Sequence, residues 1–274
     1  MILLDFLANP WLWIIILFVI GIIAGTVVGI VGGSGVIVVV PLLTLLGFTV
    51  HTAIGTSLCV DVVASLVAAY TYWQNKRIDI SRGAWMGAAA VGGAQVGTLL
   101  ATSTPAMSLS WAFVIFLFAN GIVFLRTDME KITTRMSAFA NTKLYGGGGL
   151  DTPTGRRRAA IISAIFGFGI GIVSGFFGAG GGMLFLYVLI LVLGYELHLA
   201  VGTSTLIMAI TAASGAIGYA LHGDLDILAA AFIIVGTIIS SRLGAKLANK
   251  LGANVLARVI AVILIALGIM MLFA

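Results

Sequence analysis

The sequence predicts an all-α, polytopic membrane protein built from two inverted-topology repeats of about five membrane segments each. Of its 274 residues, 61% are hydrophobic and only 8% are charged, whereas soluble domains carry about 25% charged residues. Apolar runs of bilayer-spanning length, about 20 residues each, recur along the chain, and spans in lipid of this kind are helices. The chain also repeats itself, while its basic residues do not.

The repeat is continuous. Residues 33–125 return as residues 180–272 with a constant offset of 147 positions, so that GFTVHTAIGTS at 47–57 corresponds to GYELHLAVGTS at 194–204. Hydrophobic composition alone produces scattered matches, but not a polar HxxxGTS string in register, so the chain is a duplicated unit. The predicted domains are a first membrane repeat, a basic cytoplasmic linker and a second membrane repeat, at 1–125, 126–158 and 159–274.

The basic residues set the orientation of the two copies. Lys76 and Arg77 of the first copy face Gly223 and Asp224 of the second. A loop that is positive in one copy is thus neutral or acidic in the other. The positive-inside rule therefore predicts that the two copies have opposite orientations in the membrane. Inverted duplication is a common plan of secondary transporters. We expect both termini and the loops 102–109 and 222–226 outside, and the loops 74–83, 126–158 and 246–258 in the cytoplasm.

Within each repeat we expect the second segment to be short. Residues 183–193 cover about 17 Å at 1.5 Å per residue, against a hydrocarbon core of about 30 Å. Two arrangements stay open: a thin or tilted crossing, and a re-entrant hairpin. The longer segments of the repeats are expected at 84–101, 110–125, 159–178, 198–221, 227–247 and 256–273.

Each short segment begins at a glycine cluster, GGSG at 32–35 and GAGGG at 178–182. Successive glycines at membrane depth indicate a broken helix, and a helix that restarts after a break offers free N–H groups and a positive dipole end to an anion. The alternative is close helix packing by small residues. The substrate-binding candidates from these clusters are Gly33, Ser34, Gly35, Gly180, Gly181 and Gly182.

The HxxxGTS strings supply further substrate-binding candidates. The histidine precedes Gly-Thr-Ser by one helical turn, so an imidazole and hydroxyl groups of each copy can approach one point, and inverted symmetry then brings the two points together near the midplane. In the alternative, the hydroxyls donate to carbonyls of their own helix and each histidine caps a loop. The candidates are His51, Thr56, Ser57, His198, Thr203 and Ser204.

These motifs carry a family resemblance. They are the doubled hairpins GIVGGSGVIVVVPLL and GFFGAGGGMLFLYVL, the strings AIGTSL and AVGTST, and the segments GAQVGTLLA and SSRLGAKLA. With these motifs, the sequence resembles the TauE/SafE family of membrane permeases, the sulfite-exporter type, over essentially the whole chain. The resemblance implies a carrier in a bacterial-type cytoplasmic membrane for small sulfur-containing anions such as sulfite or organosulfonates.

Three residues break the symmetry between the copies and are candidates for coupling or gating. Asp61, opposite Met208, lies in an apolar helix, where a carboxylate is costly; it carries a proton or helps to hold a coupling cation, or it is a neutral group bonded to a neighbouring helix. Gln95 and Arg242 occupy equivalent positions. Arg242 either snorkels to the cytoplasmic surface or is a fixed cation at the inner mouth of the pathway.

We therefore expect a gradient-driven secondary transporter that exports a sulfite-like anion, and not an enzyme. No GxxxxGK[ST] motif for nucleotide binding occurs, and no cofactor, metal site or nucleic-acid partner is expected. The expected partners are the small anion and the lipid bilayer, and a homodimer is compatible with a chain this small. The alternative is a cation or metal permease, or a channel, that uses the His pair and Asp61.

Overall fold

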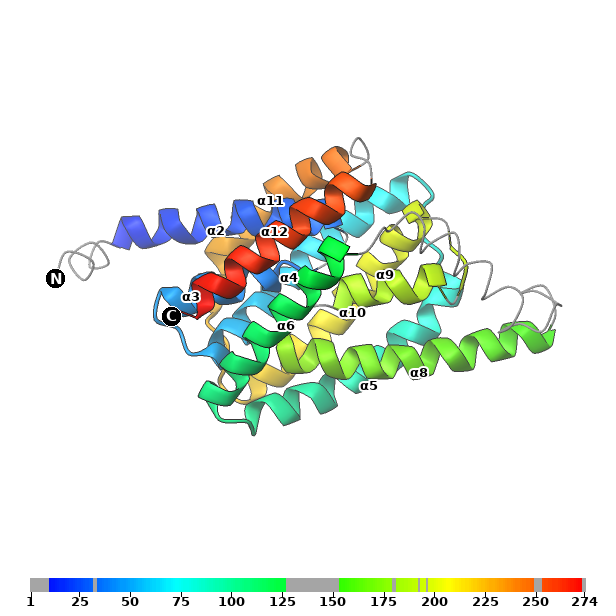
Figure 1. The fold of residues 1–274 in the computed structure, drawn as a ribbon, viewed down its shortest axis with the longest axis horizontal. Coiled ribbons are helices and arrows are strands. Elements are labelled where there is room, and N and C mark those ends of the chain that lie inside the picture. Colours follow the sequence, from blue (N-terminus) through cyan, green and yellow to red (C-terminus); the bar gives the residue numbers. More distant parts are fainter. Residues whose placement is uncertain are drawn as a thin grey trace.

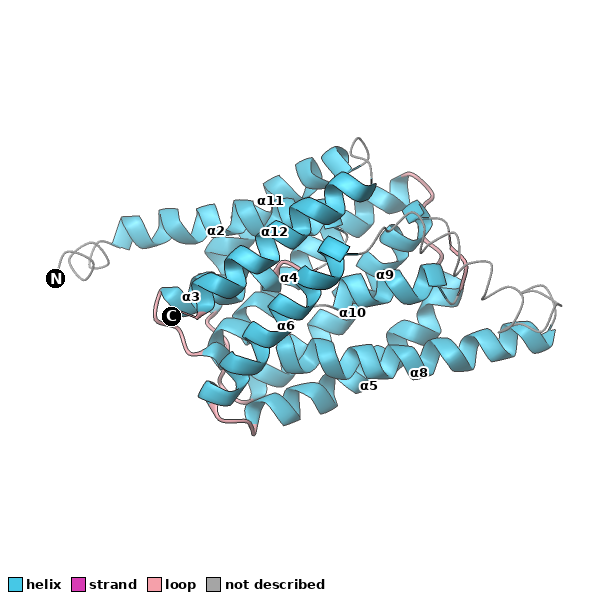
Figure 2. Cartoon of the chain, viewed as in Figure 1, coloured by secondary structure: helices cyan, strands magenta, loops and turns pink. Residues whose placement is uncertain are grey.

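A computed structural model of the chain describes residues 10–31, 34–126, 153–178, 181–191, 193–195, 197–248 and 253–272. Over these residues the protein consists of helices and connecting loops, with no strand (Figure 2). The all-α prediction is confirmed. In chain order the helices are α2 (Pro10–Val31), α3 (Val36–Leu45), α4 (Val50–Gln74), α5 (Ile80–Thr102), α6 (Ala106–Arg126), α8 (Pro153–Phe177), α9 (Gly181–Leu191), α10 (Leu197–Leu221), α11 (Ile227–Ala248) and α12 (Ala253–Met271).

The helices have the length and surface of membrane spans. By length and composition, seven of those in the described part of the chain can cross a membrane, namely α2, α4, α5, α6, α8, α10 and α11. Their outward faces carry large apolar side chains, and Trp85, Ile115 and Leu228 are 61%, 65% and 73% exposed. Exposed apolar surface on this scale fits contact with lipid rather than water. The protein is a multi-pass membrane protein.

The ends of several helices follow from local sequence. α8 begins at Pro153, a residue type suited to the first position of a helix, so residues 153–158 extend this helix into the region expected to be linker. The turns that follow the short helices contain Gly47 (φ +93°) and Gly194 (φ +65°), which occupy equivalent positions in the two copies. Because glycine adopts positive φ without a steric penalty, the duplicated glycine fixes the same turn twice.

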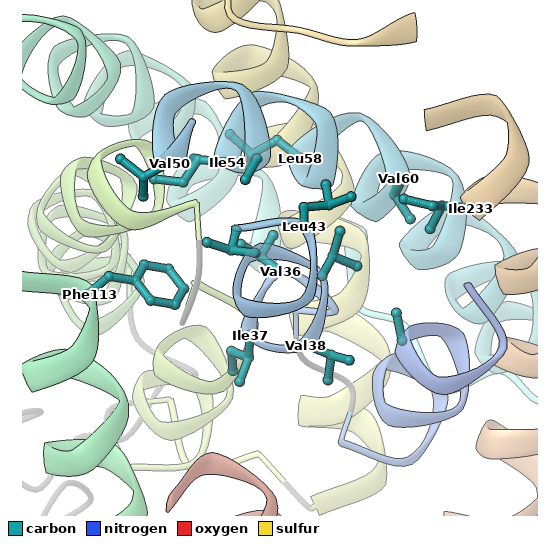
Figure 3. Close-up of a cluster of buried hydrophobic side chains, with 14 of the residues drawn as sticks. Val36, Ile37, Val38, Leu43, Val50, Ile54, Leu58, Val60, Phe113 and Ile233 are labelled. Atoms are coloured by element: carbon teal, nitrogen blue, oxygen red, sulfur yellow. The ribbon is translucent and has the colours of Figure 1, made fainter. Parts of the chain in front are cut away.

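The second segment of each copy is short, as predicted. α3 has 10 residues and α9 has 11, which at 1.5 Å per residue gives about 15 Å and about 17 Å. Neither length spans a hydrocarbon core of about 30 Å. α3 is enclosed by protein: its Val36, Ile37, Val38 and Leu43 are at most 2% exposed and lie among α4 and neighbouring helices (Figure 3).

The two copies interlock rather than forming separate halves. α2 of the first copy packs along α11 of the second, and α5 of the first packs along α8 of the second. α4 contacts α10, its counterpart, and α6 contacts α12. In Figure 1, α2 and α11 lie along one side of the bundle, α5 and α8 lie along the other, and α4 and α10 run between them. The 147-residue offset relates the α2–α11 pairing to the α5–α8 pairing, whereas α4–α10 and α6–α12 are each a pairing of counterparts.

Glycines allow the outer pairs to approach closely. A Cβ atom added to Gly93 on α5 would lie 2.1 Å from the carbonyl oxygen of Phe168 on α8, and one added to Gly21 on α2 would lie 2.1 Å from that of Ile233 on α11. Any side chain would force the backbones apart. Small residues at such contacts are typical of helix packing in membranes, so these glycines serve packing.

Candidate functional site

The structure brings the two glycine breaks together at the centre of the bundle. The Oγ of Ser34, in the first break, lies 3.4 Å from the carbonyl oxygen of Gly178, where the second break begins. A Cβ atom on Gly178 would lie 2.6 Å from Cγ2 of Ile54 on α4. The start of the second break thus lies directly against the first copy. Of the candidates in the two clusters, Gly33 and Gly180 lie outside the described residues.

At the first break, a carboxylate occupies the N-terminus of the short helix. Asp61, on α4, is fully buried; its Oδ1 accepts from the backbone N–H of Gly35 at 2.7 Å, and its Oδ2 accepts from Ser34 Oγ. Ser34 Oγ in turn accepts from the N–H of Val36 at 3.2 Å. A negative group at this end of a helix is stabilised by the helix dipole and the free N–H groups. The break thus binds the carboxyl group of one of the protein's own side chains.

At the second break, the equivalent position holds a thioether. Adding 147 converts Ser34 into Gly181, Gly35 into Gly182 and Asp61 into Met208. Gly181 and Gly182 are buried, and a Cβ atom on Gly181 would lie 2.9 Å from Sδ of Met208. The helix N-terminus therefore meets the same position of the long third helix in both copies, with different chemistry.

The threonines of the HxxxGTS strings tie the copies to each other. Thr56 Oγ1 accepts from the N–H of Asp226 at 3.0 Å, and Thr203 Oγ1 accepts from the N–H of Asp79 at 3.1 Å. Both threonines are fully buried. The two bonds are equivalent, because the 147-residue offset relates Thr56 to Thr203 and Asp79 to Asp226. Each threonine holds the start of the fourth helix of the other copy, a role that the sequence did not suggest.

The serines of the same strings are bonded within their own helices. Ser57 Oγ donates to the carbonyl oxygen of Ile54 at 2.8 Å, and Ser204 Oγ donates to that of Val201 at 2.9 Å. This is the arrangement of the alternative interpretation, in which hydroxyls donate to helix carbonyls. Each oxygen keeps its capacity to accept.

His51 is engaged at the end of a neighbouring helix. Its Nε2 lies 3.1 Å from the carbonyl oxygen of Ala101 and 3.0 Å from that of Thr104, where α5 ends. This is the capping arrangement, and His51 is not drawn toward the breaks. His198 lies at the start of α10, with its side chain outside the described residues. Among the residues that the structure describes, no three His, Cys, Asp or Glu side chains are grouped to hold a metal ion.

Gln95 and Arg242 do not meet at a common point. Nε2 of Gln95, on α5, donates to the carbonyl oxygen and to Oγ of Ser214 on α10, at 2.7 and 2.9 Å. Ser214 Oγ donates back to the carbonyl oxygen of Val91 at 3.0 Å. Gln95 therefore fastens two helices, whereas Arg242 is exposed on α11.

Two further polar contacts complete the loops near the threonines. Asp226 Oδ1 accepts from the N–H of Ala229 at 2.9 Å, so Asp226 caps the N-terminus of α11. Asp79 Oδ2 accepts from the hydroxyl of Tyr195 at 2.9 Å. Sequence reasoning missed the Tyr195 contact, because Tyr195 faces Phe48 in the other copy and no repeated signal marks it.

Comparisons with known proteins agree over nearly the full length. The family model for sulfite exporter TauE/SafE matches residues 17–271. The chain is 31% identical over 261 residues to the probable membrane transporter protein YdhB of Bacillus subtilis (strain 168), covering 95% of this chain and 99% of that protein. It is 28% identical over 290 residues to the probable membrane transporter protein MJ0441 of Methanocaldococcus jannaschii, covering 98% and 97%. No solved structure matches. The chain belongs to the TauE/SafE family of membrane transporters.

Proposed function

We propose that the protein is a secondary transporter that exports a small sulfur-containing anion, sulfite or an organosulfonate, across the cytoplasmic membrane. The observation that carries the proposal is the first break, where a backbone N–H and a serine hydroxyl hold the Asp61 carboxylate inside the protein. A sulfite or sulfonate group presents similar oxygen acceptors. The duplicated break therefore supports a site for an oxyanion.

Neutral donors suit a carrier. Among the described residues, Asp61 is the only buried side chain of the Asp, Glu, Lys and Arg types, so no buried lysine or arginine is available there to hold an anion permanently. Binding through N–H and O–H groups is weaker than binding to a full positive charge. Transport requires an ion to leave as well as to enter, and neutral donors favour that release.

Asp61 is the proposed coupling residue, with Gln95 and Arg242 as gating residues. A change in the charge of Asp61 alters its attraction for the α3 N-terminus, and an ionised carboxylate repels a neighbouring anion. Transport is therefore expected to depend on pH through Asp61. The test is Asp61→Asn in proteoliposomes over a range of internal and external pH. An unchanged rate and an unchanged pH profile contradict coupling at this residue.

The orientation proposal follows the basic loops. The segment 126–158, with seven of the fourteen Lys and Arg residues, is assigned to the cytoplasm, and both termini to the outside. Single cysteines introduced into the linker and near the N-terminus of a Cys59→Ser protein, labelled in intact cells with an impermeant maleimide, test this assignment. Labelling of the linker cysteine without permeabilisation refutes it.

The proposed function is tested by flux. Purified protein in proteoliposomes is loaded with radiolabelled sulfite, and efflux is compared with that from empty vesicles. Competition by taurine, sulfoacetate, sulfate and chloride defines the substrate class. Saturable sulfite or sulfonate flux supports the proposal. Flux of a divalent metal or an alkali cation in place of anion flux supports the alternative of a cation permease and overturns the proposal.

A further inference from the structure

The two breaks differ in the side chain that meets the N-terminus of the short helix. In the first copy the helix N-terminus is occupied by the carboxylate of Asp61, whereas in the second copy the same position carries the Met208 thioether. A thioether is a weak acceptor and has no charge. The first N–H groups of α9, like those of every helix, have no partner within the helix. The second break therefore has the backbone donors of the first break without the carboxyl group of Asp61.

A buried hydroxyl without a partner lies beside this helix end. Ser174, in the last turns of α8, is 1% exposed, and its Oγ has no hydrogen-bond partner in the described part of the chain. That oxygen is 2.8 Å from the position of a Cβ atom on Gly181, the first residue of α9. Buried hydroxyls are bonded in the large majority of cases. Ser174 is thus a donor aimed at the start of α9 and available to a ligand.

We propose that the N-terminal turn of α9, with the Ser174 hydroxyl, is the oxyanion-binding position of the transporter, and that it is single because Asp61 fills the equivalent position at α3. This inference rests on the proposed function and names the site at which it operates. The ligand is a sulfur oxyanion group, either free sulfite or the sulfonate head of a larger molecule. Its oxygens accept from the N–H groups of α9 and from Ser174, and Met208 forms an apolar wall.

Because the two breaks differ, the two copies have different roles in binding the anion. In the first copy the carboxyl group of Asp61 occupies the helix N-terminus, whereas in the second copy the helix N-terminus binds and releases a free anion. A carboxylate placed at Met208 would fill the second break in the same way. The glycine at position 181 lets Ser174 and Met208 pack directly against the start of α9, because a Cβ atom there would lie 2.8 Å from the Ser174 oxygen and 2.9 Å from the Met208 sulfur.

The test measures equilibrium binding and flux of radiolabelled sulfite, with taurine, sulfoacetate and sulfate as competitors that separate the free ion from a sulfonate head. Ser174→Ala removes one hydrogen bond to a charged ligand and is expected to raise the Kd about 10- to 100-fold. The matched control is Ser241→Ala on α11, which removes another buried hydroxyl without a partner in the described residues and is expected to leave the Kd unchanged.

A second pair of variants isolates charge from shape. Met208→Asp supplies a carboxylate to the α9 N-terminus and is expected to abolish sulfite binding, while the isosteric Met208→Asn retains it within about tenfold. Size-exclusion profiles check the fold of each variant, and if either Met208 variant fails to fold, the Ser174→Ala measurement decides.

The outcomes separate the two proposals. Sulfite flux in the wild type, with a Kd of Ser174→Ala within twofold of the wild-type value, overturns this site and leaves the proposed function standing. Equal binding by folded Met208→Asp and Met208→Asn also overturns it. Absence of binding and flux for every anion tested overturns both proposals together.

Discussion

Substitution of Asp61 measures how much the carboxyl group at the first glycine break contributes to the stability of the protein. In the folded protein its two carboxyl oxygens accept from Gly35 N–H and Ser34 Oγ, at a position that is fully buried. Asp61→Ala removes both acceptors at once. It leaves the start of α3 with unpaired donors, and it is expected to destabilise the protein.

The size of the effect follows from these two bonds. Hydrogen bonds to charged groups contribute about 1.5–3 kcal/mol each, which gives about 3–6 kcal/mol for Asp61→Ala. Bonds between membrane helices average about 0.6 kcal/mol, because the unfolded chain in the membrane also finds partners; two such bonds give about 1.2 kcal/mol. We expect a loss of about 3 kcal/mol, between these limits. Asp61→Asn keeps an acceptor for Gly35 and a group that bonds Ser34, so it is expected to lose less than half as much.

The assay is reversible unfolding of the purified protein in mixed micelles, followed by circular dichroism for wild type, Asp61→Ala and Asp61→Asn. Added formate places a small carboxylate at the vacated donors of the alanine variant. At ten times its Kd it returns about 1.4 kcal/mol, a gain that the asparagine variant does not share. A loss below about 0.5 kcal/mol in Asp61→Ala, or an equal loss in Asp61→Asn, refutes the role of the carboxylate at α3.

Three further predictions concern the contacts between copies. Gly202→Ala places a Cβ atom 2.0 Å from the carbonyl oxygen of Arg77 and is expected to reduce the yield of folded protein strongly, whereas Gly87→Ala, with its nearest neighbour at 3.9 Å, is expected to be tolerated; equal yields on size-exclusion chromatography contradict this. Thr203→Val leaves a loop N–H without its acceptor and is expected to lower the free energy of unfolding by about 1–3 kcal/mol, and an unchanged denaturation midpoint argues against the inter-copy bond. Gln95→Leu removes the bonds to Ser214 and is expected to lower the free energy of unfolding by about 1–2 kcal/mol. An unchanged free energy of unfolding in the same assay argues against that contact.

Much of the fold was accessible from the sequence because it depends on local pattern. Apolar length predicted the long helices, and the glycine clusters predicted where the short helices begin. The constant offset of 147 positions also pairs Gly47 with Gly194, and the structure places both in corresponding turns. The opposite orientation of the two copies in the membrane stays a prediction, since it depends on where the loops lie relative to a bilayer.

The partners of the polar side chains were not accessible in the same way. Sequence reasoning grouped His51 with Ser57 because they are near neighbours on one helix, but His51 contacts carbonyls about 50 positions away and Ser57 bonds its own helix. It marked Asp61 as an outlier at membrane depth without identifying its partners. Ser174 carried no signal at all, because one serine in an apolar helix is ordinary until its surroundings are known.

The sequence by itself determined that this chain is a duplicated bundle of membrane helices interrupted at two glycine clusters, because hydrophobic length and glycine content act over a few neighbouring residues. Only the tertiary structure decided which break is occupied by a side chain and which has, among the described residues, a buried hydroxyl without a partner. That distinction rests on helices from distant parts of the chain: α4 delivers Asp61 to one helix end and α10 delivers Met208 to the other. Hydrogen-bond partners across a bundle are set by packing, which no local pattern encodes.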